Sequence, residues 1–177
     1  MKNHNYNNIL IFIVILIFLS ACTIAPKGVE PISGFELDRY LGKWYEIARL
    51  DHSFERGLSR VTAEYSLRDD GGVKVINRGY NPDKNEWKEA VGKAYFVEEP
   101  YIGQLKVSFF GPFYGGYNIL ALDKASYQYA LVAGPNRSYL WILARLPNLD
   151  TFLVEQLVKK AQQMRFPVDD LIYVSHD

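Results

Sequence analysis

The amino-acid sequence predicts an all-β domain, an eight-stranded up-and-down antiparallel barrel with one α-helix packed outside it and a short final strand. Between Leu41 and Leu146, short apolar, β-branched and aromatic runs alternate with turn signals, as in an antiparallel meander. After Pro147 the hydrophobic period changes to a helical one. With 13 Tyr, 10 Phe and a single Cys, we expect an aromatic-rich interior without an internal disulfide.

Residues 1–21 are predicted to be a lipoprotein signal peptide. The apolar run from Ile9 to Leu19 is about eleven residues long, short of the roughly 20 that a membrane-spanning helix needs. The segment Leu19-Ser20-Ala21-Cys22 resembles the bacterial lipobox, in which the cysteine becomes the mature N-terminus and carries acyl chains. We therefore expect lipidation at Cys22. The alternative is that the apolar segment is not cleaved and remains on the chain as a short membrane anchor.

The residue after the lipidated cysteine indicates which bacterial membrane holds the protein. In enteric bacteria an Asp there favours retention at the inner membrane, and this chain has Thr23. The resemblance therefore implies a lipid-anchored protein of the outer membrane, with its barrel facing the periplasm. Several acyl chains make a durable anchor, because each buried methylene contributes ~0.8 kcal/mol. Residues 22–33, which contain Pro and Gly, are interpreted as the lipidated tether, and residues 34–177 as the barrel domain with its helix.

Turn signals divide the barrel region into about eight strands. The first strand runs from Lys43 to Leu50, and the clearest hairpin joins Val61–Leu67 to Val73–Tyr80 through Asp69-Asp70-Gly71-Gly72. The further breaks are Asn81-Pro82-Asp83, Glu99-Pro100, Gly111-Pro112, Asp123 to Ser126, and Gly134-Pro135-Asn136. Eight such strands can close on themselves, which removes unpaired edges and leaves an interior sized for side chains or one small ligand.

The predicted helix follows the last barrel strand. Asn148 and Asp150 are candidate N-cap residues, and the helix is expected to stop before Pro167. The apolar residues that recur at helical spacing are Val154, Leu157, Val158 and Ala161. A last short strand is predicted at residues 171–174.

Several kinds of chemistry find no support. Lys plus Arg and Asp plus Glu both number 20, so no basic field exists to attract nucleic acid. His52 and His176 have no Cys or His companions at metal-ligand spacing, and His4 lies in the signal peptide. The chain also lacks a Gly-x-Ser-x-Gly elbow and a phosphate-binding glycine loop. We therefore expect no metal, no cofactor and no catalysis.

Two signatures carry a resemblance to a known family. Gly42-Lys43-Trp44-Tyr45 matches Gly-x-Trp-Tyr at the start of the first barrel strand, and Arg145 falls at the end of the last barrel strand. The chain therefore resembles the lipocalins. The resemblance implies that Arg145 lies across the Trp44 indole and closes the barrel floor, a contact worth about 0.5 to 2 kcal/mol.

Longer stretches extend the resemblance over essentially the whole domain. They are residues 51–58, 65–72, 107–118 and 139–143. The middle signature departs from the family pattern, because Leu122-Asp123-Lys124 stands where Thr-Asp-Tyr is usual. This departure bears on one hairpin at the bottom of the barrel.

Strand alternation then assigns a pocket. The resemblance to mammalian lipocalins implies that Tyr65 and Asn77 point inward, and alternation with Trp44 turns Glu46 and Ala48 inward. The remaining inward assignments include Ala94, Phe96, Leu105, Val107, Phe109, Asn118, Leu120, Trp141 and Leu143. The predicted ligand-binding residues are Tyr65, Asn77, Phe96, Phe109, Asn118 and Trp141. A one-residue bulge in any strand would exchange its faces.

The cavity chemistry, apolar and aromatic with a few polar groups, suits an amphiphile with a long tail. The resemblance supports a protein that binds, stores or transports fatty acids or lysophospholipids. One alternative is a lipid-modifying enzyme that uses His52, Glu55 or Glu46 as acid or base, and another is an interaction lipoprotein with a filled barrel. The loop aromatics Phe54, Phe113 and Tyr114 are expected to surround the mouth of the barrel. Two interpretations of this surface remain: contact with a membrane, or contact with a second copy in a homodimer.

Overall fold

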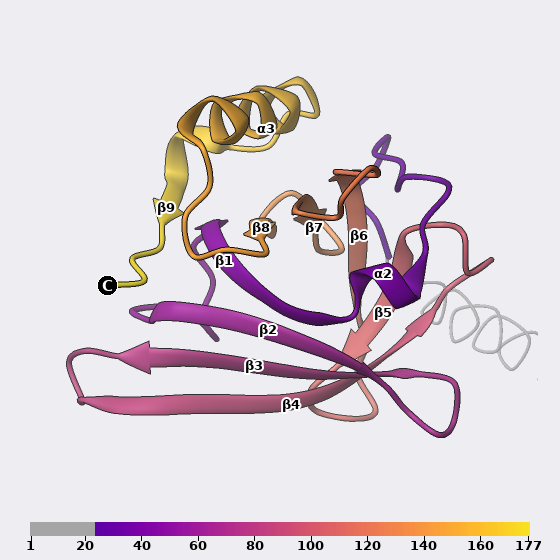
Figure 1. The fold of residues 1–177 in the computed structure, drawn as a ribbon, viewed down its shortest axis with the longest axis horizontal. Helices are drawn as coiled ribbons and strands as arrows, with labels where there is room; N and C mark the ends of the chain where they lie inside the picture. Colours follow the sequence, from indigo (N-terminus) through magenta and orange to yellow (C-terminus); the bar gives the residue numbers. More distant parts are fainter. Residues whose placement is uncertain (1–23) are drawn as a thin grey trace, which may run out of the picture.

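The computed structural model describes residues 24–177. The predicted signal peptide, Cys22 and Thr23 lie outside the described residues. The model confirms the predicted fold class, because eight antiparallel strands close into a barrel, one longer helix packs on its outside, and a ninth short strand follows (Figure 1).

The barrel strands follow one another around the sheet in sequence order. They are β1 (Gly42–Leu50), β2 (Ser59–Leu67), β3 (Val73–Asn81), β4 (Glu86–Phe96), β5 (Gln104–Ser108), β6 (Gly115–Leu122), β7 (Tyr129–Ala133) and β8 (Leu140–Ala144). Strand β1 pairs with β2 on one side and with β8 on the other, which closes the barrel. Strand β9 (Leu171–Tyr173) pairs with residues 48–50 of β1.

The helix predicted after the barrel is α3 (Thr151–Gln163). Its N-cap is Asp150, whose carboxylate accepts hydrogen bonds from the first backbone N–H groups of the helix, which ties the helix start to one residue. A single helical turn, α2 (Leu37–Tyr40), precedes β1, and a 3₁₀ turn covers Val168–Asp170. Within residues 24–177, no helix has the length and apolar character needed to cross a bilayer.

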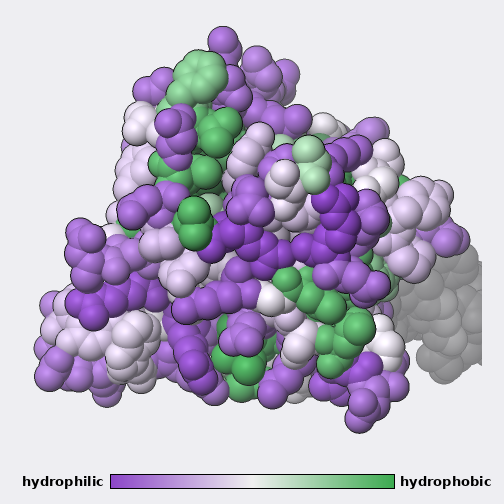
Figure 2. Space-filling model, viewed as in Figure 1, coloured by the Kyte–Doolittle hydropathy of each residue, from purple (hydrophilic) through white to green (hydrophobic). Residues whose placement is uncertain are grey.

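The barrel has two apolar cores, one inside it and one between its wall and α3. The inner core contains Trp44, Tyr65 and Leu143. The outer core joins Leu131 of β7 to Val154, Leu157 and Ala161 of α3, the face that the helical spacing predicts. Strands β6, β7 and β8 are therefore buried on both faces. Figure 2 shows a mainly hydrophilic surface on this side of the molecule, with apolar groups near α3 and in smaller clusters in the lower half of the view.

Two irregularities in strand pairing overturn part of the predicted face assignment. The register between β1 and β8 shifts between Glu46 and Ala48, so Ala48 packs in the outer core, and its predicted inward orientation is wrong. Arg49 instead turns back toward Glu46 and is fully buried. A β-bulge places two successive residues opposite one, which moves the following side chains to the other face.

The predicted inward orientation of Asn118 and Leu120 in β6 is also wrong. Tyr117 and Ile119 face the inner core, and Leu120 packs in the outer one. A second register shift follows between Ile119 and Ala121. The physical reason is that β6 is buried on both faces, so its sequence carries no alternation of polar and apolar residues from which to read a face.

Residues 24–33, assigned to the tether, lie along the outside of the barrel. Val29 is buried in the outer core. The Ile32 N–H donates to the Ile119 carbonyl at 2.9 Å, and the Ile32 carbonyl accepts from the Gly103 N–H at 2.8 Å. Ser33 then forms a β-bridge with Ile102. The described part of the tether is thus packed against the strands.

Candidate functional site

The barrel interior holds a cavity in two parts. The inner part has a volume of about 100 Å³, and the outer part, with a volume of about 660 Å³, opens between the loops that join β1 to β2, β5 to β6 and β7 to β8. The residues that line both parts are Phe54, Glu55, Val61, Asn77, Val107, Phe109 and Trp141. The two parts therefore adjoin one another and share these side chains as walls.

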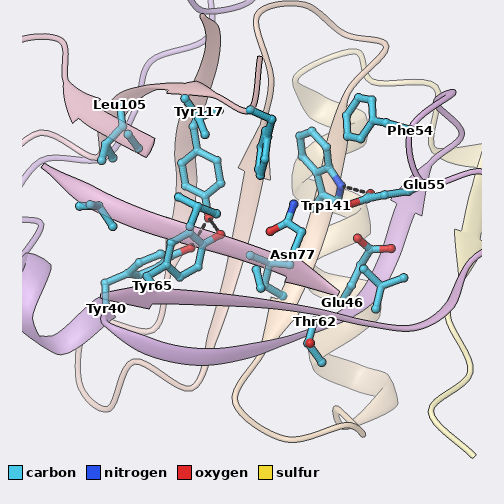
Figure 3. A pocket seen from close by; sticks show the side chains of 18 of the residues that line it. Tyr40, Glu46, Phe54, Glu55, Thr62, Tyr65, Asn77, Leu105, Tyr117 and Trp141 are labelled. Atoms are coloured by element: carbon cyan, nitrogen blue, oxygen red, sulfur yellow. Dashed lines mark hydrogen bonds between the residues drawn. The ribbon is translucent and has the colours of Figure 1, made fainter. Parts of the chain in front are cut away.

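Three tyrosines close the inner end of the pocket. The Tyr117 hydroxyl lies 2.7 Å from the Tyr40 hydroxyl and 2.8 Å from the Tyr65 hydroxyl, and the three rings meet from α2, β2 and β6 (Figure 3). Burial raises the pKa of all three phenols, so each stays neutral and serves as a hydrogen-bonding group. The inner end is therefore polar but uncharged.

The floor beneath the tyrosines is closed by the two family signatures. The Trp44 ring packs on Tyr40 with a centroid distance of 4.6 Å, and its Nε1 donates to the Tyr40 carbonyl. The Arg145 guanidinium lies 4.0 Å from the Trp44 ring centroid, the arrangement that the resemblance implies. Gly42 has a φ of +91°, a conformation that favours glycine, and a Cβ there would meet the Arg145 guanidinium at 3.5 Å.

A buried charged cluster forms one wall of the pocket. Arg49 Nη1 donates to Glu46 Oε1 at 2.6 Å, and Arg49 Nη2 donates to the Glu55 carbonyl at 3.0 Å. Glu55 Oε2 lies 2.9 Å from His52 Nε2 and accepts a hydrogen bond from Trp141 Nε1 at 3.1 Å. The β1 bulge makes this cluster possible, because it turns Arg49 toward the side on which Glu46 lies.

The two carboxyl groups of the cluster shift in opposite directions. Burial raises the pKa of Glu46, and the neighbouring charge of Glu55 raises it further, against the lowering effect of Arg49. Burial acts in the same direction on Glu55, but its interactions with His52 and Trp141 outweigh burial and lower its pKa. The opposite shifts follow from the different partners of the two carboxyl groups within one buried cluster.

Asn77 of β3 lies midway along the pocket and lines both of its parts (Figure 3). Its Oδ1 atom is buried and has no hydrogen-bond partner among the described residues. A buried polar atom without a partner is energetically costly.

Four of the six predicted ligand-binding residues, Tyr65, Asn77, Phe109 and Trp141, line the pocket. Phe96 does not line it, because β4 ends near the floor and the Phe96 ring packs on Phe35 with a centroid distance of 6.1 Å.

Asn118 lies outside the pocket and fixes the N-terminal segment. Its Nδ2 donates to the carbonyl oxygens of Ile24 at 2.7 Å and Gly134 at 3.1 Å, and its Oδ1 accepts from Gln104. The prediction of Asn118 as a ligand contact is therefore wrong, because its amide is fully engaged by the protein on the outer face of β6.

Sequence reasoning missed Tyr117, Tyr40 and Arg49. A signal for Tyr117 was present, because its parity matches Ile119 and both are large apolar or aromatic residues. No sequence signal exists for Arg49, since only the bulge turns it inward.

Comparison with known proteins agrees with this geometry. The family model described as a lipocalin-like domain matches residues 35–176. The chain belongs to the lipocalin family. The outer membrane lipoprotein Blc of Vibrio cholerae is 54% identical over 165 residues, which cover 93% of this chain and 96% of that protein. Apolipoprotein D of Rattus norvegicus is 38% identical over 124 residues, covering 65% of this lipocalin and 63% of the rat protein.

The solved structures agree on the fold. Insecticyanin from the tobacco hornworm Manduca sexta superposes with a TM-score of 0.70 at 20% identity, over 86% of each chain. The likeness to Blc places this lipocalin at the outer membrane. The unusual Leu122-Asp123-Lys124 signature leaves the bottom hairpin intact, because the Asp123 carboxylate accepts three backbone N–H bonds within the turn.

Proposed function

We propose that this lipocalin binds one fatty acid or lysophospholipid in its barrel and stores or transports it at the outer membrane without covalent chemistry. The observation that carries the proposal is the pair of adjoining cavities, which end at the three tyrosines inside the barrel and open between the loops at its other end. An acyl chain that moves from water into this pocket gains about 0.8 kcal/mol per buried methylene. Such a gain needs only apolar lining and a closed end.

The shape of the pocket supports one orientation of the lipid. The tail occupies the narrow inner part, among Val75, Ala94 and Leu105. The head group occupies the wide outer part, where Lys88 and the ion pair of Arg78 with Glu89 supply both signs of charge. A head group with an anionic phosphate suits these cations.

Two alternatives are less well supported. A barrel filled by its own side chains would leave no volume comparable to the 660 Å³ of the outer part. An enzyme would need an acid or base that reaches the ligand, and Glu46 and Glu55 both line the pocket, so the turnover measurement below tests this alternative. His52 is buried and does not line the pocket, because its ring stacks on Phe54 with a centroid distance of 3.9 Å. We therefore propose that His52 holds Glu55 in place rather than acting on a substrate.

The proposal includes the anchor. Cys22 carries acyl chains that insert in the outer membrane, and the barrel faces the periplasm. The support is the lipobox-like sequence before Cys22, together with the relatives described as outer membrane lipoproteins.

A titration tests lipid binding. A form that begins after Cys22 is stripped of lipid and titrated with lysophospholipid and with fatty acid, while Trp fluorescence is recorded. Saturation near one ligand per barrel is expected. Trp141→Phe should remove most of the signal, and Trp87→Phe, at an exposed ring outside the pocket, should leave it. An unsaturable response with every amphiphile, with no lipid in the mass spectrum of the untreated protein, contradicts the proposal. Continued turnover of lysophospholipid, lost in Glu46→Gln or Glu55→Gln, would favour the enzyme.

A further inference from the structure

The N-terminal segment begins at the mouth of the barrel. Ile24 is bonded through its carbonyl to the Asn118 amide, and the same amide bonds the Gly134 carbonyl. Gly134 and Gly116 line the outer part of the pocket. From Ile24 the segment passes along β6 to Ser33, which pairs with Ile102 in the loop after β4 at the floor end. The direction of this path places Ile24 at the rim of the pocket.

This contact requires a specific pair of residues. A Cβ atom on Gly116 would lie 1.7 Å from the Ile24 carbonyl oxygen, so only glycine at this position lets the segment lie against β6. Asn118 is fully buried and satisfies the same carbonyl. The start of the described chain is therefore held on the barrel by backbone and amide contacts.

The chain has little length left between this contact and the predicted anchor. Cys22 lies two residues before Ile24. Two residues of fully extended chain span at most about 7 Å. An anchor acylated at Cys22 would therefore tether the chain within about 7 Å of Ile24.

The rim itself exposes large aromatic side chains. Phe110 is 78% exposed, Phe113 is 80% exposed and Phe54 is 55% exposed, and all three line the outer part of the pocket. Contiguous apolar groups around an opening mark an interaction surface. Aromatic rings are also enriched where proteins meet the interface between membrane and water.

We propose that the N-terminal segment and this aromatic rim together hold the open mouth of the barrel against the bilayer that carries the acyl chains of Cys22. The occupant of the rim is thus the lipid surface, and a second copy of the chain is the alternative that the experiment tests. A membrane lipid then enters the pocket without crossing water. The inference rests on the acylation of Cys22, which belongs to the proposed function.

A competing apolar surface lies elsewhere. Phe152 at the start of α3 and Tyr173 of β9 are 65% and 62% exposed. If the anchor did not fix the orientation of the barrel, the surface around Phe152 and Tyr173 would contact the membrane as readily as the mouth. Labels on both surfaces separate the two cases.

The experiment uses the full chain, acylated in a bacterial host, purified in detergent and reconstituted in vesicles of phosphatidylethanolamine and phosphatidylglycerol. Since the sequence has one cysteine, acylation of Cys22 leaves an introduced cysteine as the only thiol. Spin labels are placed by Phe113→Cys at the mouth, by Phe152→Cys on α3, and by Asp69→Cys in the exposed turn at the floor. Collision with oxygen, which concentrates in lipid, is compared with collision with a water-soluble nickel complex.

The expected result is a ratio of oxygen to nickel accessibility several-fold higher at position 113 than at positions 152 and 69. Gly116→Ala in the same labelled chain should lower the ratio at position 113, because the added Cβ displaces Ile24. Gly115→Ala is the matched control, since a Cβ there meets nothing within 4 Å. A flexible Gly-Ser insertion between Thr23 and Ile24 should also lower the ratio and does not touch the barrel.

Other outcomes overturn the inference. If the label at position 152 or 69 has the highest ratio of oxygen to nickel accessibility, another face of the barrel contacts the bilayer. If neither Gly116→Ala nor the insertion changes the ratio of oxygen to nickel accessibility at position 113, the N-terminal segment does not orient the barrel. Distance measurements that find pairs of labels at position 113 close together and shielded from oxygen assign the rim to a second copy. Mass spectrometry of the same sample reports acylation, and its absence overturns the anchor as well. The lipid titration is independent of all these results.

Discussion

The Arg145 guanidinium lies 4.0 Å from the centre of the Trp44 ring and also donates hydrogen bonds to the carbonyls of Arg39, Lys43 and Tyr127. One side chain thus covers the tryptophan and ties the turn before β1 to the loop between β6 and β7. This pair closes the floor of the barrel, below the inner end of the pocket.

We expect Arg145→Lys to destabilise the fold although it keeps the charge. A lysine has no planar group to lie on the indole and cannot reach three carbonyls at once. The expected loss is about 1 to 3 kcal/mol in the free energy of unfolding, measured with urea. The control is Arg68→Lys in the exposed β2–β3 turn, where a loss below about 1 kcal/mol is expected. Equal losses for the two variants would argue against a special role for the floor contact.

The Tyr117 hydroxyl links two others, and this makes the three tyrosines unequal. Tyr117→Phe leaves both the Tyr40 and the Tyr65 hydroxyl without their partner, whereas Tyr65→Phe removes one bond and leaves Tyr117 bonded to Tyr40. Unfolding measurements should show a loss of about 1 to 3 kcal/mol for Tyr117→Phe and about half of that for Tyr65→Phe. The reverse order would show that the trio does not share its bonds as described.

The raised pKa of Glu46 predicts a pH dependence of stability. The folded protein retains a proton that the unfolded chain releases above its ordinary pKa of 4.5, so wild-type stability should fall as pH rises above that value. One such group contributes a slope of at most about 1.4 kcal/mol per pH unit. Glu46→Gln carries no titrating proton and should flatten this part of the curve.

Urea unfolding at a series of pH values measures the slope. Glu64→Gln, at an exposed carboxylate on β2, is the control and should follow the wild type. If Glu46→Gln and wild type run parallel above pH 4.5, then Glu46 is charged in the folded protein.

Asn77 places an unpartnered oxygen in the middle of the pocket. Asn77→Leu should leave stability unchanged or raise it by up to about 1 kcal/mol, since a buried polar atom without a partner disappears. Its affinity for a lipid should change in the titration described above, because the apolar side chain alters both parts of the cavity. Asn148→Leu, at an exposed position before α3, is a control outside the pocket. Wild-type affinity in Asn77→Leu would remove Asn77 from the ligand site.

The sequence by itself determined the class and order of elements. Turn residues and apolar runs are local signals, and they predicted about eight closing strands, a helix with Asn148 or Asp150 as its N-cap, and a final strand. The structure contains all of these elements and selects Asp150 as the cap. In strands with one buried face, the alternation of residues also agreed with the assignment of inward-facing side chains. On β2 and β3 the family resemblance assigned Tyr65 and Asn77 to the interior, and both residues line the pocket.

Only the tertiary structure decided the rest of the site. Strands β1 and β6 are covered outside by α3 or by the N-terminal segment, so both faces are buried and a one-residue bulge leaves no trace in the sequence. That bulge turns Arg49 to Glu46 and creates the buried charged cluster. The docking of Ile24 on Asn118 joins residues 94 positions apart. Local periodicity indicates which residues are buried. Contacts between distant segments determine whether a buried residue packs inside the barrel or on its outer face.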